Sequence, residues 1–122
     1  MIGSARIASG GDYCFDSNGF GLIAKGFKPT SAGKCKPWKG GFSEFGDVVN
    51  GSGCTSSDGT TLRIGYTVHG SGNGFETGQL VIPLPALTGG TTYYTSCLAG
   101  TCTDHTGAAS GAPCIPPTPP IP

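Results

Sequence analysis

Six cysteines in a chain of 122 residues constrain the fold more than any other feature. An even number of cysteines in a short chain is typical of a disulfide framework, and disulfides persist in oxidising compartments. A zinc site is disfavoured, because no two cysteines are separated by two residues, as zinc ligands usually are. We therefore expect six paired cysteines and a protein that works at an extracellular or virion surface. The residues are Cys14, Cys35, Cys54, Cys97, Cys102 and Cys114.

The pairing of these cysteines is open at the level of sequence, because six cysteines allow 15 connectivities. The short separation of Cys102 and Cys114 favours a local bridge between them. The other four cysteines would then join the first half of the chain to the strand that ends near Cys97.

The 23 glycines and 10 prolines favour strands, turns and extended backbone over helices. No window of eleven residues carries the apolar stripe of an amphipathic helix. The predicted fold is all-β: a small disulfide-stapled antiparallel sandwich or barrel of five to seven short strands, with long loops and extended termini. We expect an extended arm over residues 1–11, one β domain over 12–114 and a proline-rich tail over 115–122.

Strict alternation of apolar and polar residues marks the clearest strand, Thr60–His69, and predicts one face on the core. The predicted core residues of this strand are Leu62, Ile64, Tyr66 and Val68. Asn18-Gly19 predicts a hairpin turn within 12–25. Further strands are expected over 77–82, ending at Pro83 or lying at an edge, and over 91–98. Residues 26–47 read as an irregular stretch, 50–53 as a turn, and the chain beyond Cys102 as a loop.

Seven basic and seven acidic residues give a formal net charge of zero. A neutral chain does little to repel its own copies and lacks the basic field that nucleic acid binding needs. No run of apolar residues is long enough for a membrane span. No cofactor or metal is expected, and partners are copies of the protein, another surface or virion subunit, or a glycan.

All five lysines fall in one segment together with Phe27, Trp38 and Phe42. One interpretation is a basic, aromatic loop that binds an anionic glycan or an acidic surface. The other is a lysine-rich loop whose aromatic side chains fill the core beneath it. The candidate binding residues are Lys25, Lys28, Lys34, Lys36, Trp38 and Lys39.

Three further features allow a functional interpretation. Asn50 begins an N-x-S tripeptide, a possible glycosylation site in an exposed turn. His69 and His105 leave a serine hydrolase open, but no G-x-S-x-G motif supports it. Ile115 and Ile121 are apolar residues within the proline-rich tail. They would anchor the tail, as an extended polyproline segment, along another subunit.

Without a catalytic motif, the first expectation is a non-catalytic structural or assembly subunit of a surface structure, filament or virion. Its copies would associate through extended termini and free strand edges. The alternative is a secreted carbohydrate-binding module that uses the lysine-rich loop, or a stacking platform formed by Trp38, Tyr66, Tyr93 or Tyr94. A small secreted hydrolase is the second alternative.

Overall fold

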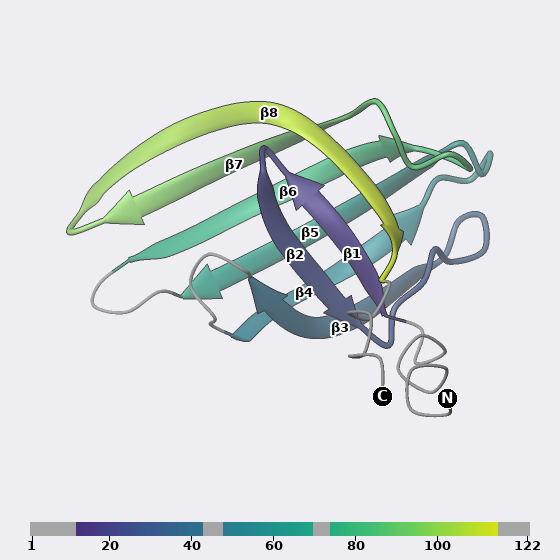
Figure 1. Cartoon of the computed structure of the whole chain (residues 1–122), viewed down its shortest axis with the longest axis horizontal. Coiled ribbons are helices and arrows are strands. Elements are labelled where there is room, and N and C mark those ends of the chain that lie inside the picture. The colour runs from purple at the N-terminus through teal and green to yellow at the C-terminus, as the bar shows by residue number, and fades with distance from the viewer. Residues whose placement is uncertain (1–11, 43–47, 70–73, 115–122) are drawn as a thin grey trace, which may run out of the picture.

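A computed structural model describes residues 12–42, 48–69 and 74–114 of the chain. These residues form eight antiparallel strands that close into a barrel, and none of them is helical (Figure 1). The strands are β1 (Tyr13–Ser17), β2 (Phe20–Lys25), β3 (Cys35–Phe42), β4 (Val48–Thr55), β5 (Thr61–His69), β6 (Phe75–Pro83), β7 (Gly90–Leu98) and β8 (Thr101–Pro113). The expected all-β, disulfide-stapled fold is confirmed, in its barrel form.

Each strand pairs with the next along the chain, and β8 pairs with β1 to close the ring. Closure gives every described strand two neighbours, but residues 35–38 of β3 have no partner from β2 and residues 101–108 of β8 have none from β1. Association of copies through strand edges therefore stays a prediction. The expected N-terminal arm and C-terminal tail, with Ile115 and Ile121, lie outside the described residues.

The β1–β2 hairpin and strands β5, β6 and β7 agree with the sequence patterns. Asn18 and Gly19 both have positive φ, as a two-residue hairpin turn requires. In β5, Leu62, Ile64 and Val68 are buried whereas Arg63 is exposed. β6 ends at Pro83, where a proline would interrupt the ladder.

The sequence prediction fails for β3, β4 and β8, which it assigned to loops or a turn. The glycines that suggested turns stand at close contacts inside the sheet. A Cβ atom at Gly51 would lie 2.6 Å from the Trp38 ring, and one at Gly53 would lie 2.3 Å from the Phe27 ring. β8 shows no alternation, because Ala109 is its one buried residue and pairing with β7 and β1 holds the strand in place.

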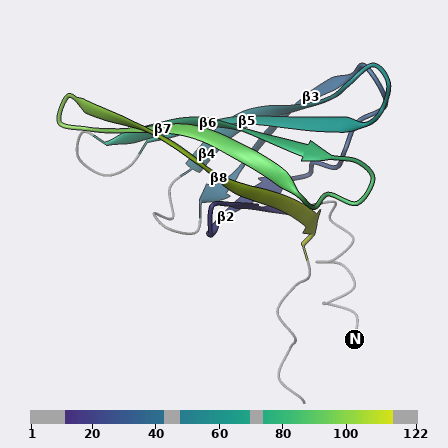
Figure 2. The same cartoon turned by 90° about the horizontal axis from the view of Figure 1, so that it is seen from above.

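The hydrophobic core fills the barrel interior with large side chains from β1, β2, β3, β5, β6 and β7 and from the segment that follows β2. In Figure 2, β5, β6 and β7 form the upper layer of the barrel and β2 lies below them. The fully buried large residues include Phe15, Leu22, Phe27, Leu62, Ile64, Leu80 and Ile82. Since the interior is occupied by these side chains, ligands are expected on the outer surface rather than in a central channel.

All six cysteines are paired, as expected, but the favoured Cys102–Cys114 bridge is wrong. The bridges are Cys14–Cys114, Cys35–Cys54 and Cys97–Cys102. Strand register decides this pairing. Cys35 lies directly opposite Cys54 on β3 and β4, and Cys97 lies opposite Cys102 on β7 and β8. Three intramolecular disulfides are characteristic of proteins from oxidising compartments.

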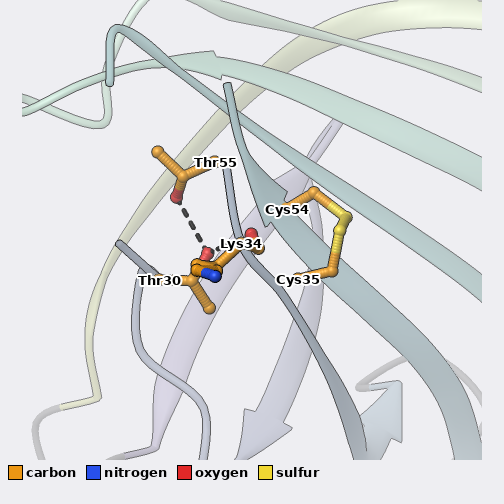
Figure 3. Close-up of a disulfide and its surroundings, with 5 residues drawn as sticks. All are labelled: Thr30, Lys34, Cys35, Cys54 and Thr55. Atoms are coloured by element: carbon orange, nitrogen blue, oxygen red, sulfur yellow. Dashed lines mark hydrogen bonds between the residues drawn. A yellow bond between two sulfur atoms is a disulfide. The ribbon is translucent and has the colours of Figure 1, made fainter. Parts of the chain in front are cut away.

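Figure 3 shows how the Cys35–Cys54 bridge is supported at the start of β3. The Thr30 hydroxyl donates to the Lys34 carbonyl oxygen at 2.7 Å and lies 3.0 Å from the Thr55 hydroxyl. The Thr55 amide also donates to the Lys34 carbonyl oxygen, at 3.0 Å. These contacts hold the segment before β3 against the end of β4.

Candidate functional site

An open depression of about 460 Å³ lies where β2 and β3 diverge. Lys25 and Lys39 are the last paired residues at this end of the β2–β3 ladder. Beyond them, Gly26 adopts a φ of 66° and turns the chain away, so the beginning of β3 has no partner from β2. The hollow is therefore a consequence of strand divergence. Its lining residues are Lys25, Gly26, Lys36, Pro37, Trp38, Lys39 and Asn50.

The depression is basic, because three of its lining residues are lysines and none is acidic. The Lys36 ammonium donates to the Gly26 carbonyl oxygen at 3.0 Å, which fixes this charge at the rim. Lys25 and Lys39 lie directly opposite each other on neighbouring strands, and both are exposed. Neither has a carboxylate partner among the described residues. Like charges opposite each other across a strand pair are unfavourable, and a bound anion would relieve that repulsion.

Trp38 contributes to the wall of the depression but is itself buried, with 4% of its surface exposed. Its ring packs over Gly51, and its indole N–H has no hydrogen-bond partner in the described part of the chain. Phe27 is completely buried. These two rings therefore fill the core, as the second interpretation of the lysine-rich segment holds. The side chain of Phe42 lies outside the described residues.

The structure gathers only part of the lysine-rich segment around the depression. Lys28 and Lys34 are exposed on the connection between β2 and β3 but do not line the hollow. Asn50 does line it, because it lies opposite Lys39 in the β3–β4 ladder. Asn50 is exposed on a strand rather than in the expected turn.

Among the four aromatic residues considered as a stacking platform, only Tyr93 is available to a ligand. Its side chain is 51% exposed on β7, whereas Trp38, Tyr66 and Tyr94 are buried. The alternation along β7 explains the difference, because Tyr93 and Tyr94 point to opposite faces of the sheet. Sequence alone does not say which of two adjacent tyrosines faces the core.

A polar pair inside the barrel was missed by the sequence prediction. The Tyr66 hydroxyl donates to the Glu76 carboxylate at 2.5 Å, and Glu76 is only 9% exposed. Burial raises the pKa of the Tyr66 phenol well above its ordinary value, and the hydrogen bond and charge of Glu76 raise it further. The sequence did carry a signal for a buried Glu76. It is separated from Leu80 and Ile82 by an even number of positions along β6, so all three face the barrel interior.

The two histidines do not join a catalytic triad within the described residues. His69 is exposed at the end of β5. The His105 ring stacks on Tyr94 with centroids 4.9 Å apart, and its Nε2 lies 3.1 Å from the Ser96 hydroxyl. Asp104 points to the other face of β8, where it accepts a hydrogen bond from Thr95 at 2.6 Å. Adjacent positions on a strand thus separate Asp104 from His105.

The described part of the chain contains no cluster of three His, Cys, Asp or Glu side chains that could bind a metal ion. It also contains no helix long and apolar enough to cross a membrane. Comparison with protein-family models, with curated proteins and with solved structures found no match to this chain. The basic depression is therefore the candidate site, on its geometry and charge alone.

Proposed function

We propose that this protein is a secreted, non-catalytic module that binds an anionic polysaccharide through the basic depression. The opposition of Lys25 and Lys39, with Lys36 at the same rim, carries the proposal. A carboxylate or sulfate group in the hollow would accept hydrogen bonds from two ammonium groups that otherwise repel each other. The Asn50 amide beside them supplies a neutral donor and acceptor for sugar hydroxyls.

The charge distribution favours a polysaccharide over nucleic acid. The chain is neutral overall, and only three of its described basic side chains, Lys25, Lys36 and Lys39, line the depression. Nucleic acid binding draws most of its affinity from many phosphate contacts, which three lysines do not provide. The three disulfides fit the oxidising environment in which extracellular polysaccharides occur.

Binding to hyaluronan oligosaccharides, measured by isothermal titration calorimetry, tests the proposal. We expect the double variant Lys25→Gln/Lys39→Gln to bind at least about tenfold more weakly than the wild type. This estimate takes the loss of a charge-assisted hydrogen bond as roughly 1.5–3 kcal/mol. Binding should also weaken as salt is raised, because the ammonium groups are exposed and screened.

The matched control is Lys28→Gln/Lys34→Gln, which removes the same charge from the same segment outside the depression. We expect this variant to bind within about twofold of the wild type. Equal weakening by both pairs would mean that diffuse charge, not the depression, attracts the ligand. Wild-type binding to neutral dextran as tight as to hyaluronan would also contradict the proposal.

A second candidate function, an assembly subunit that attaches through its chain ends, is favoured by the Cys14–Cys114 bridge. The Cys114 amide also donates to the Asp12 carbonyl oxygen at 3.0 Å. The first and last residues of the described barrel, Asp12 and Cys114, therefore lie side by side. Segments attached at this one point would suit contact with a neighbouring subunit or a larger particle.

Deletion of residues 115–122 tests this second function, because it removes no cysteine and no described core residue. We expect the melting temperature to stay nearly unchanged and the mass measured by light scattering at high concentration to fall toward that of a monomer. A full-length protein that is itself monomeric under these conditions would contradict the assembly function. So would a truncated protein that assembles as well as the full-length protein.

A further inference from the structure

A continuous outward-facing row crosses seven strands and begins at the depression. Strand register places these residues side by side in the order Lys25, Lys39, Asn50, Thr67, Thr77, Thr95 and Asp104. Residues adjacent to this row along their strands, such as Trp38, Tyr66 and Tyr94, point into the barrel and are buried. The depression and the outer face of β5, β6 and β7 are therefore parts of one surface.

The outer face beyond the depression is polar but uncharged over several strands. Between Lys39 and Asp104 the row carries only an amide and threonine hydroxyls, with Thr67 and Thr77 hydroxyls 3.3 Å apart. The next outward row consists of Gly65, Gln79, Tyr93 and Thr106. Both rows cross β5, β6 and β7, which are consecutive strands of the barrel wall (Figure 2).

Tyr93 gives this face a stacking surface. Its ring is 51% exposed and is flanked in register by Gln79 on β6 and Thr106 on β8. An exposed tyrosine ring offers a rigid apolar plane at a low cost in conformational entropy, and the neighbouring amide and hydroxyl supply hydrogen bonds. This combination suits a pyranose, which has an apolar face and a rim of hydroxyls.

We propose that a linear polysaccharide, with carboxylates separated by neutral sugars, binds along this face as well as in the depression. A carboxylate occupies the site of Lys25 and Lys39, the following sugars cross β5 and β6, and a neutral sugar stacks on Tyr93. This inference rests on the proposed function. Charge complementarity supports it, because the row is basic at Lys25 and Lys39 and uncharged from Asn50 to Thr95. From Lys39 on β3 to Tyr93 on β7 there are four strand intervals, about 19 Å at the usual spacing, so several sugars are needed to span them.

The test compares a hyaluronan tetrasaccharide with a decasaccharide on the intact, oxidised protein. We expect the wild type to bind the decasaccharide at least about tenfold more tightly. Tyr93→Ala should remove most of this gain and leave tetrasaccharide affinity within about twofold, whereas Tyr93→Phe, which keeps the ring, should retain the gain. Leu98→Ala is the control, because Leu98 is an exposed apolar residue at the far end of β7, 65% exposed and outside the two rows.

The failures of the two proposals are distinguishable. We call the proposed binding surface from the depression across β5 and β6 to Tyr93 the track. Binding that depends on Lys25 and Lys39 but is equal for both lengths overturns the track and leaves the depression as the site. A gain with length that survives Tyr93→Ala reflects several binding registers on a long ligand, and it also overturns the track. Failure of both oligosaccharides to bind the wild type overturns the track and the proposed function together.

Discussion

At the scale of single residues, glycines inside strands leave room for core side chains to pack against the sheet. Gly53 on β4 stands beneath the Phe27 ring, and a Cβ atom there would approach Phe27 Cζ to 2.3 Å and Ile64 Cδ1 to 2.7 Å. Both neighbours are fully buried and belong to the packed core. The absence of a side chain at this position is thus a packing requirement rather than a turn signal.

Gly53→Ala is expected to lower the free energy of unfolding by about 1–3 kcal/mol, as overpacking of a filled core does. Urea denaturation followed by fluorescence measures the change. Gly41→Ala on β3 is the matched control, because a Cβ atom at Gly41 meets nothing within 4 Å. We expect Gly41→Ala to leave stability unchanged or slightly raised. Equal losses in the two variants would contradict the packing argument.

At the scale of elements, the turn between β4 and β5 is organised by the Asp58 carboxylate. Asp58 Oδ1 accepts hydrogen bonds from the Ser56 hydroxyl at 2.6 Å and from the Thr60 hydroxyl at 2.7 Å. The Thr60 amide donates to the same oxygen at 3.1 Å. These bonds, led by that of Ser56, lower the pKa of Asp58 from 3.8 to about 2.

The charged carboxylate is favoured in the folded state, so its contribution to stability is complete above pH 3.8 and is lost as the pH falls toward 2. We expect Asp58→Asn to be less stable than the wild type at pH 7. The difference should shrink below about pH 4 and disappear only below about pH 2. Urea midpoints of both proteins across this range provide the measurement. A constant difference at every pH would show that the charge is not responsible.

At the scale of the whole molecule, the three disulfides close loops of very different length. Cys14–Cys114 spans 100 residues and secures the β1–β8 seam, Cys35–Cys54 spans 19, and Cys97–Cys102 spans 5. A bridge restricts the unfolded chain more when its loop is longer. The Cys14–Cys114 bridge therefore contributes most to the stability of the barrel.

Replacing one pair of cysteines at a time with serine should destabilise in the same order. Chain entropy gives losses of about 4.7 kcal/mol for Cys14–Cys114, about 3.2 for Cys35–Cys54 and about 2 for Cys97–Cys102. Guanidinium denaturation of the three double variants under non-reducing conditions measures these values. The reverse order, or three equal losses, would contradict the dominance of the seam bridge.

The sequence by itself determined the elements whose residues carry a local signal. Alternation identified β5, the Asn18-Gly19 turn identified the β1–β2 hairpin, and the cysteine count identified the framework of bridges. It also located the lysine-rich segment, because charge composition is visible without a fold. These features depend on neighbouring residues or on composition, so they can be predicted without knowledge of long-range contacts.

Only the tertiary structure decided which cysteines pair, that β8 is a strand, and which lysines face one another. Lys25 and Lys39 are 14 positions apart and meet because of the β2–β3 register, and Asn50 joins them through β4. Tyr93 is exposed and Tyr94 buried for the same reason. Register is set by the packing of the whole barrel interior, and a shift of one residue would exchange the two faces of the shifted strand.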